Sequence, residues 1–199
     1  MNYILIATKN PGKLHEYQTL LAPYHYLVKS LFDFPEIKEI KEIGNTFEEN
    51  ALLKAKSLYE ITHIPVIADD SGLMVRALNG DPGVHSKRYS ANGTDEANNQ
   101  LLIKNMQNIE DTAAKFVCVI AYYINQSKHP LFRGETDGII VLEPKGKNGF
   151  GYDPHFYYPD LKKTFAQLTI KEKNLVSHRA KAFRQLIAFM EGNDETCHL

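Results

Sequence analysis

Cysteine is scarce in this chain of 199 residues, and its two copies form neither a C-x-x-C pair nor a dense disulfide framework. The sequence therefore gives no support for a disulfide-stapled fold. We expect Cys118, inside an apolar run, to be a buried small hydrophobe and Cys197 to be a thiol of the tail. The eight histidines lack H-E-x-x-H or C-x-x-C…H spacing, so zinc has no obvious ligand set. Any bound metal should be a hard cation held by oxygen.

The chain also lacks an excess of positive charge and a long apolar run. Its formal net charge of −1 gives no basic surplus for a polyanion, so nucleic acid is not an expected partner. No stretch approaches the ~18 apolar residues of a membrane span, and the opening MNYILIATKN lacks the basic start of a signal peptide. We therefore expect no membrane association and a cytoplasmic location. Apolar residues at 43% and charged residues at 24% are typical of one compact globular domain, here 1–199.

The hydrophobic periodicity predicts an α/β fold. A buried strand over Asn2–Thr8 is followed by a polar turn and a helix that begins at Pro11. Further patterns predict helices over Thr46–Thr62, Asp95–Asn108 and Ser177–Glu191, and strands over Ile64–Ala68, Lys115–Asn125 and Leu131–Leu142. The last two strands are expected to pair across a turn as a hairpin-like second lobe. The strand before them should end at the acidic residues 69 and 70, where α/β folds place chemistry.

The turn between the first strand and the first helix is a candidate phosphate site. It consists of Thr8, Lys9, Asn10, Pro11, Gly12 and Lys13. Free backbone N–H groups and the helix dipole favour an anion there, and Thr8, Asn10 and Lys13 can add hydrogen bonds and charge. The turn is not a GxxxxGK[ST] phosphate loop. A capped turn with a surface lysine is an equally good interpretation of this segment alone.

Two adjacent carboxylates, Asp69 and Asp70, give a sharper signal. Burying them is costly unless a cation or strong hydrogen bonds compensate, so a metal site or an acid–base role is favoured over a solvated acidic turn. A second acidic ligand cannot be chosen from charge alone, because Glu36, Glu39 and Glu42 look equally like a solvated face.

Three later segments carry weaker signals. The loop 82–90 contains the adjacent cations Lys87 and Arg88, which would reach a triphosphate or decorate the surface. The loop 145–154 combines glycines with two aromatics and Asp153, as a base-binding loop or a stapled turn would. At the start of the last helix, a Ser-His-Arg run at 177–179 favours binding of an anion or a carbonyl oxygen. A lone His-Arg pair, however, usually lies at the surface without a function.

Five motifs in order resemble the inosine triphosphate pyrophosphatase family. They are T-x-N-x-x-K at the N-terminus, A-D-D-S-G-L, P-G-x-x-S-x-R-Y-S, F-G-Y-D-P and S-H-R, and together they span nearly the whole chain. The resemblance implies an α/β fold with a mixed, elongated central sheet, flanking helices and two lobes around a substrate cleft. It also implies a homodimer that uses Mg²⁺ to hydrolyse non-standard purine nucleoside triphosphates such as ITP, dITP and XTP to the monophosphate and pyrophosphate.

The same resemblance implies a role for each matched position. Glu42 and Asp70 would bind magnesium, and Asp70 would also be the catalytic general base. The substrate would be bound by Thr8, Lys9, Asn10, Pro11, Gly12, Lys13, Lys54, Ser71, Phe150, Gly151, Tyr152, Asp153, Lys173, His178 and Arg179. Among these, Phe150 would stack on the purine, Asp153 would accept from the ring N–H, and His178 or Arg179 would donate to the 6-oxo group. The chain departs from many relatives at Lys41-Glu42, where those relatives carry two acids.

Two other functions compete with this one. A sensor module could hold a purine nucleotide without hydrolysing it, although a pure binder gains little from paired acids near phosphates. Another pyrophosphatase could prefer pyrimidine or modified nucleotides. The 6-oxo group and protonated N1 of hypoxanthine and xanthine separate them from adenine, whereas guanine would have to be rejected at its 2-position. The sequence does not rank ITP, dITP and XTP as substrates. It also does not show which of the cations Lys87 and Arg88 would contact the substrate.

Overall fold

The computed structural model describes residues 3–38 and 40–192. The expectations for Glu39 and Cys197 lie outside these ranges. The α-helices are α1 (Pro11–Leu21), α2 (Phe47–Thr62), α3 (Asp95–Met106), α4 (Ile170–Val176) and α5 (His178–Met190). The strands are β1 (Tyr3–Ile6), β2 (Leu27–Ser30), β3 (Val66–Val75), β4 (Ala113–Tyr123), β5 (Leu131–Ile140), β6 (Phe156–Tyr158) and β7 (Lys163–Thr164).

The strands form one mixed sheet of seven strands in the order β2-β1-β3-β4-β5-β6-β7. β1 pairs in parallel with β2 and with β3, as expected where helices connect successive strands. β6 pairs antiparallel with β5 and with β7. The predicted mixed sheet with flanking helices is therefore confirmed.

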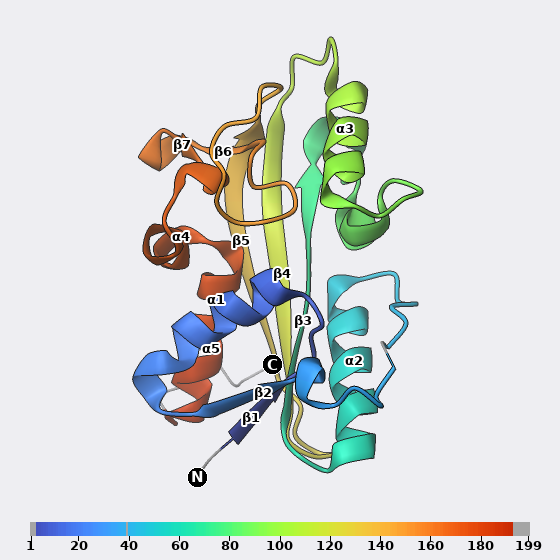
Figure 1. Cartoon of the computed structure of the whole chain (residues 1–199), viewed down its shortest axis with the longest axis vertical. Helices are drawn as coiled ribbons and strands as arrows, with labels where there is room; N and C mark the ends of the chain where they lie inside the picture. Colours follow the sequence, from blue (N-terminus) through green and yellow to red (C-terminus); the bar gives the residue numbers. More distant parts are fainter. Residues whose placement is uncertain (1–2, 39, 193–199) are drawn as a thin grey trace. The chain divides into compact units, whose positions relative to one another are not determined.

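The chain divides into two compact units. The first comprises 1–70, 118–134 and 179–199. Within it, α1 and α5 lie on one side of the strands and α2 on the other (Figure 1). Tyr17 and Leu21 of α1 pack with Phe183 and Leu186 of α5 and with Ile4 and Ile6 of β1. Apolar residues at helical spacing thus bury one stripe of each helix against the alternate side chains of a strand.

The second unit comprises 71–117 and 135–178. Its core contains Leu73 and Val75 of β3 and Leu102 and Met106 of α3. An aromatic cluster completes this core, in which Phe116, Phe156 and Phe165 lie with ring centroids 4.6 to 5.7 Å apart. Buried aromatic rings provide large apolar areas, so this unit has a rigid core beneath its loops.

The predicted helices that became α1, α2, α3 and α5 are confirmed, as are the strands β4 and β5. The N-terminus of α2 is capped by Thr46 Oγ1, which accepts from the N–H of Glu49 at 3.1 Å. Glu49 in turn accepts from the N–H of Asn45 at 2.7 Å rather than from Thr46, so the capping box is displaced by one residue.

Two expectations about the chain were wrong. The strand over Ile64–Ala68 does not end at the acidic pair, because the apolar residues after Gly72 continue β3 to Val75. The predicted hairpin is not a lobe by itself, since the segment 118–134, which contains the turn and the adjoining parts of both strands, belongs to the first unit and the remainder of both strands to the second. The helix α4 was not predicted, and α5 begins one residue after the predicted start because Ser177 is the C-cap of α4.

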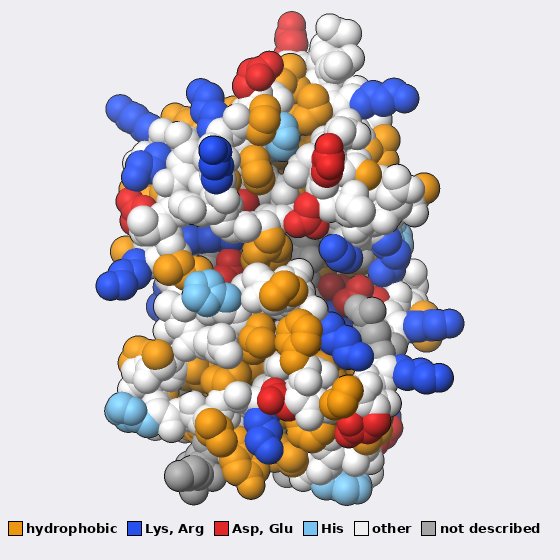
Figure 2. All heavy atoms as spheres, in the orientation of Figure 1, with side chains coloured by type: hydrophobic (Ala, Val, Ile, Leu, Met, Phe, Trp, Pro, Cys, Tyr) orange, Lys and Arg blue, Asp and Glu red, His pale blue; other side chains and the backbone are white. Residues whose placement is uncertain are grey.

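Across the part of the chain that the structure describes, every helix is too short or too polar to cross a lipid bilayer. Figure 2 shows Lys and Arg side chains interspersed with acidic and apolar ones on the face that it draws.

Candidate functional site

The N-terminal turn is a capped helix start. Pro11 occupies the first helical position, and Asn10 Oδ1 accepts from the N–H of Gly12 at 2.8 Å and of Lys13 at 3.1 Å. Thr8 Oγ1 accepts from the N–H of Asn10 at 3.0 Å. The capped-turn interpretation is therefore correct for the backbone, but the lysine is not a surface residue. Its side chain is 15% exposed and pairs with a buried carboxylate.

That carboxylate is Asp69, whose side chain is 1% exposed. Asp69 Oδ2 lies 2.9 Å from Lys13 Nζ and 3.0 Å from Arg179 Nη2, and the Cys118 thiol approaches it at 3.8 Å. Burial raises the pKa of Asp69, but Lys13 and Arg179 outweigh it and hold this pKa well below its usual range. Asp69 is therefore ionised and forms ion pairs with two cations.

Arg179 is buried, and its guanidinium joins Asp69 to a second carboxylate. Its Nη1 atom donates to Glu16 Oε2, and the side chains of both residues are almost completely buried. Burial opposes the charged form, yet Glu16 and Asp69 raise the pKa of Arg179. Sequence reasoning missed Glu16; the available signal was an acid one helical turn after Lys13 on the apolar side of α1. Substrate contact by Arg179 stays a prediction.

Asp70 lies in a different environment although it is the next residue. Asn50 Nδ2 donates to its Oδ2 atom at 3.0 Å, and Lys54 Nζ lies 3.8 Å from its Oδ1 atom. Burial raises the pKa of Asp70 above its usual value, Lys54 opposes this shift and Glu42 adds to it. Asn50 was not singled out from the sequence; it lies one turn before Lys54 on the buried face of α2.

The ammonium group of Lys54 lies among three oxygen atoms. Its ammonium lies 2.5 Å from Glu42 Oε1, 2.6 Å from the Asp69 carbonyl oxygen and 3.8 Å from Asp70 Oδ1. Burial lowers the pKa of Lys54, but Asp70 and Glu42 outweigh it, so the group stays charged. Carboxylate and carbonyl oxygens are the ligands that hard divalent cations prefer, so this donor set fits such a cation.

This donor set contains two carboxylates, those of Glu42 and Asp70. Among residues 3–38 and 40–192, no group of three or more His, Cys, Asp or Glu side chains could hold a metal ion. Mg²⁺ is commonly bound through one or two carboxylates together with water and substrate phosphates rather than by an all-protein cage. The site is therefore suited to a cation that arrives with a phosphate ligand.

The second unit holds another buried ion pair. Asp153 Oδ2 accepts from Lys173 Nζ at 2.6 Å and from the N–H of Phe150 at 3.0 Å, and the side chains of Asp153 and Lys173 are 3% and 4% exposed. The same ammonium lies 4.9 Å from the centroid of the Phe150 ring, within cation–π distance. Three of the predicted base-binding residues are thus in mutual contact.

The loop that carries Phe150 depends on glycine. Gly149 and Gly151 have φ of +75° and +61°, the region that side chains disfavour. The following residue anchors the loop, because the Tyr152 hydroxyl donates to the Ser86 carbonyl oxygen at 2.8 Å inside the unit. A Cβ atom at Gly149 would lie 2.0 Å from Asp153 Oδ2, whereas one at Gly151 would meet no atom within 4 Å.

Gly149→Ala is therefore expected to weaken binding of the inosine nucleotide that the motif resemblance implies by at least about tenfold more than Gly151→Ala does. Both variants have the same backbone cost of about 1–2 kcal/mol, but only the first pushes the Asp153 carboxylate away from Lys173. The measurement is the Kd of IMP by calorimetry for both proteins. Equal losses in the two variants would show that the Asp153 position does not matter.

The remaining predicted residues lie at several places. His178, the first residue of α5, is buried and stacks on Phe116 with ring centroids 4.7 Å apart and an interplanar angle of 12°. Ser71 is half-buried in β3. Lys87 and Arg88 are both exposed in a short 3₁₀ helix, and Lys87 Nζ lies 3.5 Å from Asp95. Lys9 donates to the Ile37 carbonyl oxygen at 2.8 Å.

The structure thus groups the predicted residues within each unit. The first unit gathers Lys13, Lys54, Glu42, Asp69, Asp70 and Arg179, and the second gathers Phe150, Asp153 and Lys173. The first group carries cations and carboxylates, as a triphosphate and its metal require. The second carries an aromatic face and hydrogen-bonding groups, as a purine base requires.

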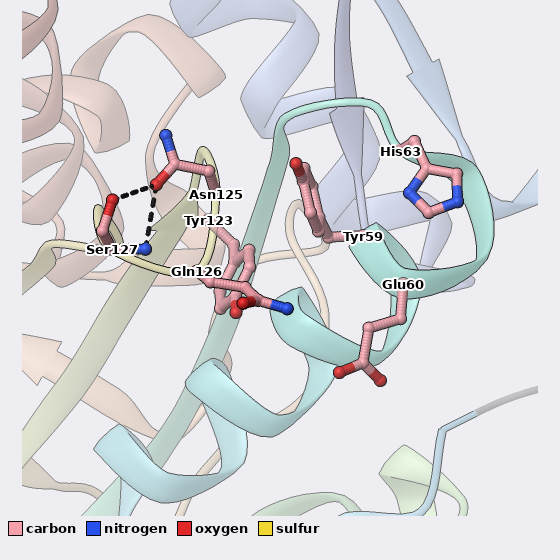
Figure 3. A pocket seen from close by; sticks show the side chains of 7 residues that line it. All are labelled: Tyr59, Glu60, His63, Tyr123, Asn125, Gln126 and Ser127. Atoms are coloured by element: carbon pink, nitrogen blue, oxygen red, sulfur yellow. Dashed lines mark hydrogen bonds between the residues drawn. The ribbon is translucent and has the colours of Figure 1, made fainter.

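A separate hollow of about 590 Å³ lies in the first unit and contains none of these residues. Figure 3 shows its lining, which comes from the end of α2 and the residue after it, and from the end of β4 and the turn that follows. The lining residues are Tyr59, Glu60, His63, Tyr123, Asn125, Gln126 and Ser127. Asn125 accepts from both the N–H and the hydroxyl of Ser127, so these polar groups close the turn itself.

Comparison with known proteins agrees with the motifs. The Ham1 family model matches residues 4–189. A dITP/XTP pyrophosphatase of Lactiplantibacillus plantarum is 48% identical over 187 residues, which are 92% of each chain, and one of Listeria innocua is 45% identical over 94% of this chain and 93% of its own. The solved Ham1 protein of Staphylococcus aureus is 42% identical with a TM-score of 0.85 and covers 97% of this chain and 100% of its own. The Ham1 protein of Coxiella burnetii is 40% identical with a TM-score of 0.87 and covers 96% and 100%. The family predicted from the sequence is confirmed, and the chain belongs to the Ham1 family.

Proposed function

We propose that this protein hydrolyses non-standard purine nucleoside triphosphates, such as ITP, dITP and XTP, to the nucleoside monophosphate and pyrophosphate. One observation carries the proposal: the adjacent carboxylates of Asp69 and Asp70 in β3 lie in different environments. Asp69 is held by Lys13 and Arg179, whereas Asp70 lies beside Asn50 and near Lys54. Neighbouring acids whose environments shift their pKa values in opposite directions are typical of a catalytic acid–base site.

In this proposal the first unit acts on the triphosphate. Asp70 orients and deprotonates the water that attacks the α-phosphorus, since burial raises the pKa of its carboxylate whereas the pKa of Asp69 is lowered, which makes Asp70 the better proton acceptor of the pair. Lys13 and Lys54 neutralise the charge that develops on the departing pyrophosphate, and their ion pairs hold them ready before substrate arrives. Asn10 and Thr8 keep the N-terminus of α1 ordered beside them, where its dipole favours phosphate.

Glu42 and Asp70 would hold the divalent cation, for which we propose Mg²⁺, together with the Asp69 carbonyl oxygen. When bound, the cation would polarise phosphate oxygens and offset their charge. The Lys54 ammonium lies 2.5, 2.6 and 3.8 Å from oxygen atoms of Glu42, the Asp69 carbonyl group and Asp70, so these three groups converge on one place. The proposal also includes a homodimer, which the resemblance implies, and a cytoplasmic location.

The second unit would bind the base. Phe150 would stack on the purine, and Lys173 and Asp153 would meet its polar edge. Their mutual ion pair fixes the donor and acceptor in place, so a base with the wrong pattern would leave a buried group unpaired. Each such mismatch costs about 1–3 kcal/mol, which is enough to separate a 6-oxo from a 6-amino purine when several occur together. His178 would add a donor from the start of α5.

A substrate panel tests the proposal. The purified protein is incubated with ITP, XTP, dITP, GTP, ATP and dUTP, with Mg²⁺ or EDTA, and products are separated by chromatography. We expect IMP, XMP, dIMP and pyrophosphate only when the divalent cation is present, with little AMP or GMP. Binding of ITP without turnover would favour the non-hydrolysing nucleotide sensor. Turnover of dUTP in place of ITP would overturn the purine specificity.

A further inference from the structure

We propose that Asp95 and Asn99 of α3 position the Phe150 ring, and that they thereby contribute to affinity for the base of the substrate. This inference rests on the proposed function, in which the loop around Phe150 receives the purine. Neither residue belongs to the motifs that predicted the site. Both act on Gly151: Asp95 Oδ2 accepts from its N–H at 2.7 Å, and Asn99 Nδ2 donates to its carbonyl oxygen at 2.9 Å.

The loop needs such support because its own sequence does not fix its conformation. Phe150 lies between Gly149 and Gly151, two glycines in the positive-φ region. Glycine loses more conformational freedom on ordering than any other residue, so this segment would sample several backbone conformations without outside contacts. A stacking ring on a mobile segment would bind a base weakly, because the ordering cost would be taken from the binding energy.

Two carboxylates fix the peptide groups on either side of the ring. Asp153 accepts from the N–H of Phe150, and Asp95 accepts from the next N–H along the chain. Holding both N–H groups restricts the φ and ψ angles of Phe150, which set the direction of its side chain. Asn99 lies four residues after Asp95 on the same helical face and holds the other end of Gly151. Gly151 is thus held at its N–H and at its carbonyl oxygen by a regular helix.

The relevant property of Asp95 is its acceptor atom rather than its charge. Its side chain is 45% exposed, and its ion pair with Lys87 is long and exposed, so neither neutralisation nor burial explains the contact with Gly151. Asparagine can present an oxygen in the same place without the charge. Alanine cannot, and it leaves the Gly151 N–H without this acceptor.

The test compares Asp95→Ala, Asp95→Asn and Asn99→Ala with Glu96→Ala as the matched control. Glu96 is the other acid in the first turn of α3, and its side chain accepts from Gln100 rather than from the loop. We expect Asp95→Ala and Asn99→Ala each to raise the KM for ITP roughly two- to tenfold, with kcat within about twofold of wild type. Asp95→Asn and Glu96→Ala should stay close to wild type.

Inorganic tripolyphosphate, which has no base, separates positioning from general damage. Its Ki as a competitive inhibitor should be unchanged in Asp95→Ala and Asn99→Ala. An unchanged KM for ITP in both variants, or a KM and a tripolyphosphate Ki that rise together, would overturn the inference. Calorimetry with IMP keeps the two proposals apart, since it needs no turnover. A wild type that binds IMP but does not hydrolyse ITP contradicts the proposed function, whereas an active wild type with unaffected variants contradicts only the role of Asp95 and Asn99.

Discussion

Asp70→Asn is expected to leave the fold intact and to lower kcat for ITP by at least about 100-fold. Asparagine keeps the shape and can still meet Asn50 and Lys54, but it can neither accept a proton from water nor provide a full charge to a divalent cation. The effect should appear in kcat rather than in the Kd of IMP, because the base-binding residues of the second unit are untouched.

Stability provides the control for this variant. The pKa of Asp70 is raised in the folded protein, chiefly by burial, so its ionised form is disfavoured there. Such a group contributes stability that is complete below its unfolded pKa and is lost as the pH rises through its folded pKa. At neutral pH the asparagine variant should therefore be as stable as wild type or more stable, as judged by thermal unfolding. Turnover near the wild-type rate would remove Asp70 from the proposed mechanism.

The sequence predicted those elements whose patterns are local. The cap at Asn10 and the proline after it indicated α1, and Thr46 indicated α2, because the residues that begin a helix lie next to it in sequence. The length of β3 could not be predicted in the same way. A polar stretch of Asp-Asp-Ser-Gly normally ends a strand, and its burial becomes acceptable only when Lys13 and Arg179 arrive from distant segments.

The chemistry of the site could be predicted more easily than its connections. The motifs identified Asp70 and the family resemblance added Lys54, yet nothing local indicated that Asn50 would contact Asp70 or that Glu16 would pair with Arg179, which is 163 residues away. The sequence alone does not distinguish Asp69 from Asp70. The opposite shifts of their pKa values arise from tertiary contacts. Likewise, Gly151 is an ordinary loop glycine until α3 places Asp95 and Asn99 against it.

Asp69→Asn should have the opposite effect to the substitution at its neighbour, with a loss of stability of about 3–5 kcal/mol. The carboxylate is almost fully buried between Lys13 and Arg179, and removing its charge leaves the buried guanidinium with one carboxylate fewer. Breaking a buried ion pair at one partner is costly because the remaining charge stays away from water. For a chain of this length we expect a fall in Tm of about 10 °C.

Two comparisons make this prediction specific. Asp111→Asn breaks a bidentate contact with Arg76 at 2.6 and 2.7 Å, but both side chains are exposed, so its effect on Tm should be much smaller.

The pH dependence is the second comparison. Because the pKa of Asp69 is lowered in the folded protein, its contribution to stability is complete above its unfolded value, near 3.8, and is lost as the pH falls below that value toward the folded pKa. The difference in unfolding free energy between wild type and Asp69→Asn should therefore be constant from pH 5 to pH 8 and shrink under strongly acidic conditions, as measured by urea unfolding. An equal Tm loss in the two variants would show that burial of Asp69 adds nothing, and Asp69 would then have no special part in holding Lys13 and Arg179.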